Sequence, residues 1–111
     1  VISDVHARFI KLLEARGLCV QEEIDFPPFR VDIYLPDYHV CVEVDGPSHS
    51  ERSDRARDYE LARVYHMPTF HISVKDIGDP DWLERLKLFL FVAAETKDGR
   101  WERCEDRTPW L

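Results

Sequence analysis

The sequence predicts a single α/β domain: one helix, three strands, a second helix, a fourth strand and a third helix. Three observations indicate this class. Apolar residues recur at helical spacing in the first segment, runs of β-forming residues follow it, and Gly17, Gly46 and the Pro27-Pro28 pair stand at apparent element boundaries. At 111 residues the chain is long enough for one buried core and too short for two ordinary domains.

Each element is expected from its own local pattern. Apolar residues recur at helical spacing from Val5 to Leu13, and Gly17 suits the left-handed position that ends a helix. Asp79 before Pro80 has the pattern of a helix start. The expected bounds are a helix over residues 4 to 16, strands over 18 to 24, 29 to 35 and 40 to 45, a helix over 51 to 66, a strand over 69 to 74 and a last helix over about 80 to 95, with the tail from 97 to 111 unassigned.

One stretch of the last helix, residues 88 to 92 with the sequence Leu-Phe-Leu-Phe-Val, is apolar on every face. A helix segment of this kind is either buried in a core or covered by another chain. We therefore expect deep burial of this stretch or a subunit contact, such as that of a homodimer.

Charge and cysteine content exclude several classes of protein. With 15 Lys and Arg against 22 Asp and Glu, the net charge of -7 excludes a simple basic nucleic-acid coat and argues against an anionic membrane surface as partner. No apolar run approaches the ~20 residues that span a bilayer. The three widely spaced cysteines indicate neither a disulfide framework nor a zinc site, so a cytoplasmic location is expected. Because the chain starts at Val1 rather than Met, we expect a domain excised from a longer protein, with partner modules outside it.

The second and third strands form a predicted hairpin around a four-residue loop over 36 to 39. In this register Leu35 pairs with Val40, and Asp32 stands opposite Glu43. Alternation then gives one apolar core face and one face that carries the acids. The core face holds Val31, Ile33, Leu35, Val40, Val42 and Val44, and the opposite face holds Arg30, Asp32, Tyr34, Cys41, Glu43 and Asp45.

Two opposed carboxylates destabilise a strand pair by up to ~1 kcal/mol, so Asp32 and Glu43 need compensation. A divalent cation is one candidate, because Mg²⁺ takes carboxylate oxygens and can polarise a phosphodiester. The alternative is purely structural. In it Asp32 lies at a solvated edge, Glu43 turns to water and Arg30 pairs with Asp45, or the two acids serve the fold through ion pairs such as one with Arg57.

The second helix continues this polar region. Leu61, Val64 and Tyr65 define its buried stripe, and toward the N-terminus the same stripe carries polar residues instead. Those residues, Asp54, Arg57 and Asp58, are expected to point at a polar site or to form ion pairs. In the preceding loop His49 is a candidate general base, because an imidazole accepts protons near neutral pH.

Three patterns, Val31–Pro36, Val42–His49 and Asp54-x-x-Arg57, together resemble the PD-(D/E)XK nuclease superfamily, whose core motif is Asp…Glu-x-Lys. The pattern is most similar to the very-short-patch-repair-like branch, which includes homing endonuclease catalytic domains with a Glu, Asp, His, Asp constellation, termed EDxHD. The resemblance covers about residues 3 to 77. It implies an αβββαβ core with a mixed central sheet flanked by helices, to which this chain adds a C-terminal helix.

The resemblance also implies roles for individual residues. Asp32 and Glu43 would bind Mg²⁺ or Mn²⁺ with help from the Val44 carbonyl, and His49 would assist proton transfer. Asp45 stands where the superfamily often has Lys. The expected catalytic residues are Asp32, Glu43, Asp45, His49 and Asp54.

Nucleic-acid binding also requires local positive charge, because phosphate contacts supply most of the affinity. On the outer side of the second helix a narrow stripe could follow a nucleic-acid backbone, or it could be a solvated face paired with Glu51 and Glu60. This basic stripe consists of Arg52, Arg55, Tyr59 and Arg63.

The sequence therefore favours a metal-dependent endonuclease domain acting on DNA, with RNA as a second possible substrate. Specificity would come from a second subunit or an additional DNA-binding module. The segment Asp45–His49 also resembles the RAP domain, an RNA-binding module, so a non-catalytic nucleic-acid-binding module is the alternative function. A structural or assembly domain with the same fold is the third hypothesis.

Overall fold

The computed structural model describes residues 4–46 and 51–104, and its elements follow the expected order. The helices and strands are α1 (Asp4–Glu14), β1 (Gln21–Phe26), β2 (Phe29–Leu35), β3 (Val40–Asp45), α2 (Glu51–Tyr65), β4 (Thr69–Ser73) and α3 (Asp81–Arg103), with a short 3-10 helix over Val74–Asp76. Among these residues no helix is both long enough and apolar enough to cross a membrane.

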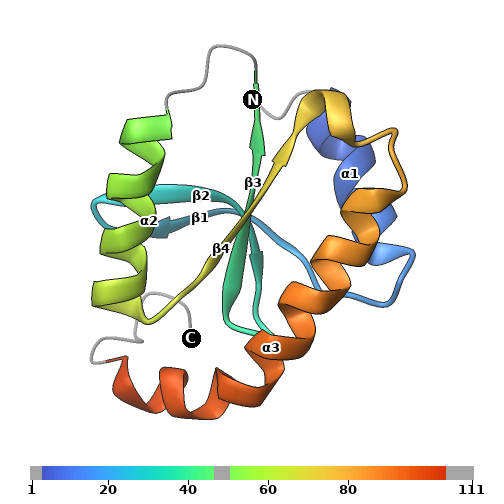
Figure 1. The fold of residues 1–111 in the computed structure, drawn as a ribbon. Helices are drawn as coiled ribbons and strands as arrows, with labels where there is room; N and C mark the ends of the chain where they lie inside the picture. The colour runs from blue at the N-terminus through green and yellow to red at the C-terminus, as the bar shows by residue number, and fades with distance from the viewer. Residues whose placement is uncertain (1–3, 47–50, 105–111) are drawn as a thin grey trace.

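The four strands form one mixed sheet in the order β1-β2-β3-β4. The first three strands are antiparallel to one another in sequence order, and β4 lies parallel to β3. Helix α2, which connects β3 to β4, covers one face, and α1 and α3 cover the other (Figure 1). The predicted α/β fold, an αβββαβ core with an extra C-terminal helix, is confirmed.

The β2–β3 hairpin has the predicted register. Leu35 pairs with Val40, and the ladder continues to Ile33 and Val42. Asp32 has no paired residue on either neighbouring strand, β1 or β3. Its backbone N–H instead donates toward the Glu43 carboxylate, with 3.4 Å between N and Oε1. Asp32 and Glu43 are therefore neighbours as expected, but through this contact rather than through a ladder pair.

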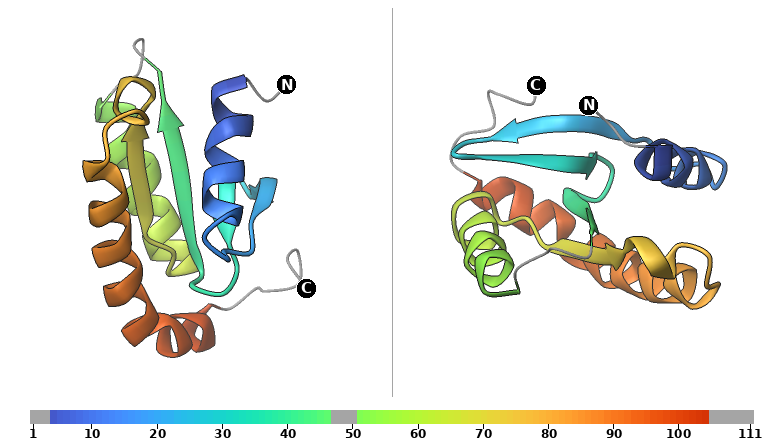
Figure 2. Two further views of the ribbon diagram at one scale, coloured as in Figure 1. Left: turned by 90° about the vertical axis from the view of Figure 1, so that its right-hand side faces the viewer. Right: turned by 90° about the horizontal axis from the view of Figure 1, so that it is seen from above.

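Both faces of the sheet carry a core, which corrects the prediction of one apolar and one acidic face. The first core, beneath α1 and α3, contains Ile33, Leu35, Val40, Val42 and Val44 as predicted. The second core lies between α2 and the β1–β2 hairpin, which curves toward α2 (Figure 2). It contains Phe26, Val31, Tyr34, Cys41, Leu61, Tyr65, Met67 and Cys104.

The curvature of the hairpin explains why Val31 belongs to the second core and not to the first. The buried stripe of α2 is confirmed at Leu61 and Tyr65. It is wrong at Val64, which is 40% exposed because it lies at the edge of the helix face that meets the hairpin.

Two elements, β1 and α3, differ from their expected bounds by more than two residues. β1 begins and ends later than predicted, because Phe26 pairs with Phe29 and the two prolines between them form the hairpin turn. α3 continues to Arg103 rather than ending near residue 95, because its last turns are held by the contacts of Arg100. The helix start predicted from Asp79 and Pro80 is confirmed: α3 begins at Asp81, and Asp79 Oδ1 accepts the Asp81 N–H at 3.0 Å.

The apolar run of α3 is not deeply buried within the described part of the chain. Leu88 is 67% exposed, Phe91 66% and Val92 54%, whereas Leu90 packs into the first core. Of the two outcomes expected from the sequence, deep burial is therefore wrong for these three side chains, because only one face of α3 meets the sheet.

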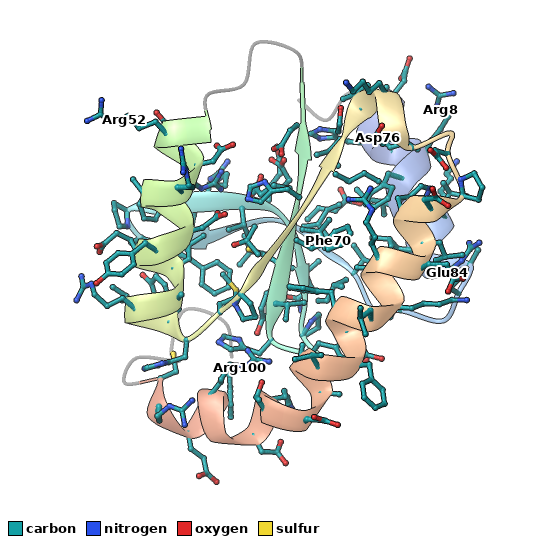
Figure 3. All side chains as sticks on the ribbon, in the orientation of Figure 1. Arg8, Arg52, Phe70, Asp76, Glu84 and Arg100 are labelled. Carbon is teal, nitrogen blue, oxygen red and sulfur yellow. The ribbon has the colours of Figure 1, made fainter. Side chains whose placement is uncertain are left out.

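Arg100 joins α3 to two loops at the lower end of the sheet (Figure 3). Its guanidinium donates to the backbone carbonyls of Tyr38, His39, His66 and Ala93 at 2.6 to 3.0 Å. The residue is 8% exposed, so water has little access to these carbonyls as a replacement donor. The residue thus fixes the β2–β3 turn and the α2–β4 connection against one helix.

We expect Arg100→Met to lower the free energy of unfolding by about 3 kcal/mol or more, because each buried carbonyl left without a donor costs ~1–3 kcal/mol. Urea denaturation measures this change. Arg103→Met, which removes an exposed arginine from the same helix, is the control and should change stability by less than about 0.5 kcal/mol. Equal losses in the two variants would contradict the assigned role of Arg100.

Candidate functional site

Polar residues from three elements gather on the α2 side of the sheet. Glu43 and Asp45 lie two residues apart on β3 and so project to the same face. The parallel register places His71 of β4 beside Glu43. The first half of α2 lies over this face and contributes Asp54, Arg57 and Asp58.

Glu43 is the buried centre of one half of the site, with 5% of its surface exposed. Arg57 Nη2 donates to its Oε1 at 2.7 Å and also to the Arg30 carbonyl at 2.5 Å. The same guanidinium lies 5.9 Å from the centre of the Phe29 ring. Arg57 therefore ties α2 to both β2 and β3 through one charged group.

The charge of Glu43 is opposed by its surroundings. Burial, followed by the hydrogen bond and the negative charge of Asp32, raises the pKa of Glu43 to about 9, and Arg57 only partly offsets this rise. The short contact with Arg57 alone would favour the ionised form. Burial outweighs it because Arg57 is shared with a carbonyl and Asp32 is a second acid beside the first. At neutral pH Glu43 therefore carries a proton in the protein without a bound cation.

His71 bridges two carboxylates in the other half of the site. Its Nδ1 lies 2.9 Å from Asp45 Oδ2, and its Nε2 lies 2.6 Å from Asp58 Oδ2. Burial acts to lower the pKa of His71, but the hydrogen bond to Asp58 and the charges of Asp58 and Asp45 outweigh it, so the net shift is upward. With a carboxylate at each nitrogen, the imidazolium form can donate both hydrogen bonds.

Three side chains in the half of the site that contains His71 are close enough together to bind one metal ion. Asp45, Asp54 and His71 each offer one ligand atom, and these atoms all lie within 4.8 Å of one another. All three side chains are half-buried, so the cluster is open to solvent on one side. Two carboxylates and one imidazole fit a divalent ion such as Mn²⁺ or Mg²⁺, because carboxylate oxygens suit both ions and imidazole is a common transition-metal ligand.

The structure brings most of the sequence-predicted acids together. Asp32 lies next to Glu43, and Asp45 lies next to Asp54. The Val44 side chain packs in the first core, so only its backbone could face a cation, and that role stays a prediction. His49 lies outside the described residues, and its role as a proton acceptor likewise stays a prediction.

The structural alternative for the acids is partly realised. Arg30 pairs with Asp25 at 2.8 Å rather than with Asp45. The expected contact between Arg57 and Glu43, in contrast, is present, and Glu43 is buried rather than turned to water. Polar residues on the core-facing stripe of α2 thus form ion pairs and face a polar site at once, so the two outcomes expected from the sequence occur together.

Sequence reasoning did not identify His71. The available signal was the alternation in β4, where His71 faces away from Phe70 and Ile72, both of which lie in the first core. A polar residue at that position predicts a polar neighbour on β3 only once the two strands are paired in parallel. That pairing is a tertiary feature, so the residue stood out only in the structure.

The predicted basic stripe lies on the outer face of α2, and its four members are exposed. Figure 3 shows Arg52 directed away from the sheet at the start of the helix. Arg63 pairs with Glu60 at 2.7 Å, as the solvated-face alternative expects. Tyr59, at 65% exposure, presents most of its ring to solvent.

Comparison with solved structures identifies a domain with a similar fold. The catalytic domain of the homing endonuclease I-Bth0305I has a TM-score of 0.66 with this chain at 15% sequence identity, and the match covers 84% of this chain and 98% of that domain. No family model matches the sequence, and no curated protein matches it either. The chain therefore has the fold of a homing endonuclease catalytic domain, which agrees with the predicted nuclease-like fold.

The raised pKa of Glu43 predicts how stability depends on pH in the presence of chelator. The unfolded chain loses this proton near the ordinary pKa of 4.5, and the folded chain keeps it until about 9. The contribution of Glu43 to the free energy of unfolding is therefore complete below pH 4.5. It falls as the pH rises above 4.5 and is fully lost once the pH has passed about 9. Glu43→Gln removes the titration, so the stability of the variant relative to wild type should rise steadily from about pH 5 to about pH 9, by up to ~1.4 kcal/mol for each pH unit.

Thermal or urea unfolding across this pH range measures the difference. Glu84→Gln, which removes an exposed carboxylate from α3, is the matched control and should give a difference that stays flat. An ionised Glu43 paired with Arg57 would produce the opposite result, in which Glu43→Gln is less stable than wild type at every pH in the range.

Proposed function

We propose that residues 1–111 form one metal-dependent endonuclease domain that hydrolyses phosphodiester bonds in DNA. The observation that carries this proposal is the convergence of Asp45, Asp54 and His71 within 4.8 Å, next to the Asp32–Glu43 pair, in a fold shared with a homing endonuclease catalytic domain. Acidic clusters of this kind serve phosphodiester hydrolysis by holding cations against phosphate oxygens.

The protein ligands can be assigned from the donors that face one another. Asp45, Asp54 and His71 would hold the cation, and the ligands expected from the sequence, Asp32, Glu43 and the Val44 carbonyl, form the adjoining part of the same site. When bound, Mg²⁺ or Mn²⁺ supplies Lewis-acid chemistry at a phosphate oxygen.

The chain's own residues would orient the substrate and the ligands. Asp58 accepts the hydrogen bond from His71 Nε2, so His71 would hold the cation as a neutral imidazole through Nδ1, the nitrogen beside Asp45, once Nδ1 has given up its proton. Among the described residues, Nε and Nη1 of Arg57 make no hydrogen bond, so this guanidinium can donate to a substrate phosphate while Nη2 keeps its contact with Glu43. The basic stripe would extend phosphate contacts along α2.

The first test is cleavage of supercoiled plasmid DNA with Mg²⁺ or Mn²⁺. Asp54→Asn should lower cleavage by about 100-fold or more, since replacing even a residue that only orients a metal ligand often costs 10–100-fold. It should also remove the thermal stabilisation that added Mn²⁺ gives the wild type. Asp98→Asn, which changes an exposed aspartate on α3, is the control and should retain full activity.

Two results would contradict this function. Cleavage that persists in chelator would exclude the metal site. Binding of nucleic acid without cleavage under any metal condition would favour the RAP-like binding module instead. Parallel assays on single-stranded RNA and on DNA would establish which nucleic acid is the substrate.

The second test concerns the basic stripe. Replacing Arg55 and Arg63 by Ala should weaken DNA binding in chelator and flatten the dependence of log affinity on log salt by about 0.9 for each phosphate that the variant no longer neutralises. The double variant Arg8→Ala and Arg16→Ala removes two exposed arginines, one on α1 and one in the turn after it, and is the matched control. Figure 3 shows Arg8 on α1, far from α2. An unchanged salt slope in the α2 variant would show that the stripe is only a solvated face.

A further inference from the structure

One face of α3 carries a stripe that the candidate site does not use. Arg85, Leu88, Val92 and Glu95 follow one another at spacings of three, four and three residues, so they lie along one side of the helix. All four are exposed, and Leu88 and Val92 present 67% and 54% of their surface to solvent. We call these four residues the α3 stripe. Its order is cationic, apolar, apolar and anionic.

Three members of the α3 stripe, Arg85, Leu88 and Val92, also line an apolar groove. It has a volume of about 680 Å³ and lies between α3 and the end of α2, over the edge strand β4. Phe70 of β4 lines it, and the Arg85 guanidinium lies 6.0 Å from the centre of the Phe70 ring. The remaining lining is mostly apolar and includes Ala62, Pro68, Phe89 and Val92. A helix that packed against the α3 stripe would therefore find apolar surface on its flank as well.

The α3 stripe is complementary to itself when read in reverse. Suppose that a second copy of α3 lies antiparallel to the first, so that Leu88 faces Val92 of the second copy. Arg85 then faces Glu95 of the second copy. Two-fold symmetry produces each of these two pairs twice. The spacing of three and four is that of the seam of a helix pair. A two-fold interface has this property, because each residue and its partner exchange places between the subunits.

We propose that this chain forms a two-fold dimer through antiparallel packing of α3 against α3, with Arg85 paired to Glu95 of the second copy. Opposite charges at the two ends of an apolar centre set the register, since sliding one helix would separate both ion pairs. The arrangement also covers Leu88 and Val92, and it places the nearby Phe91, 66% exposed, at the margin of the contact. The dimer thus explains why the apolar side chains of α3 face outward, and this explanation does not depend on the proposed nuclease activity.

Other occupants fit the surface less well. An anionic membrane would be repelled by a chain of net charge -7 and by Glu95 within the stripe itself. A small apolar ligand could enter the groove, whose lining includes Leu88 and Val92, but it would make no use of Glu95 or of the order of charges along the stripe. A second copy satisfies the apolar and the charged members together.

A charge exchange tests the register directly. By analytical ultracentrifugation the wild type should dimerise in the micromolar range. Arg85→Glu alone and Glu95→Arg alone should each weaken the dimer about tenfold or more, because each creates two like-charge contacts per dimer. The double variant Arg85→Glu with Glu95→Arg should restore dimerisation, since it rebuilds both pairs with reversed sign.

The matched control exchanges two other exposed charges of the same helix, Lys87→Glu with Asp98→Lys, and should leave dimerisation unchanged. Leu88→Asp should give a monomer whose far-UV circular dichroism is that of the wild type. A wild type that stays monomeric at the highest soluble concentration would overturn the proposal. Binding of that monomer to vesicles of anionic lipid would then identify a membrane as the occupant of the surface. A dimer that persists in both single variants, or a double variant that is not restored, would overturn it as well.

Discussion

The parallel pairing of β3 with β4 is the constraint on which the candidate site depends. A parallel pair needs a long crossover, which α2 supplies, so the polar first half of α2 lies against the face of β3 that carries Glu43 and Asp45. The register also sets His71 beside them. A shift of one residue would turn these acids into the core that now holds Val42 and Val44. Core and site are therefore specified by the same register.

Electrostatic balance is the second constraint. Carboxylates gathered in a half-buried region of an acidic chain are unfavourable unless positive groups accompany them. Arg57 accompanies Glu43, and His71 stands between Asp45 and Asp58. These groups leave the site balanced in the protein alone, but Glu43 keeps its proton. A divalent cation would take over part of this compensation, and this links the stability of the fold to the chemistry proposed for it.

Local patterns predicted most elements well because helix and strand periodicity, glycine and proline act over short distances. Gly17, with a φ of +82°, ends α1 as expected, and the β2–β3 register followed from the loop length. The expectations were wrong where distant contacts decide the outcome. α3 runs through Gly99 because Arg100 binds carbonyls more than 30 residues away, and Tyr34 is buried because the β1–β2 hairpin bends toward α2.

The sequence by itself determined the order of elements, the closeness of Asp32 to Glu43 and the polar character of the start of α2, because each depends on spacing along one chain segment. Only the tertiary structure decided that His71 joins Asp45, that Arg57 donates to Glu43 and that the apolar run of α3 faces outward. The physical reason is that strand pairing and helix docking set these contacts. Both are long-range choices that no local periodicity encodes.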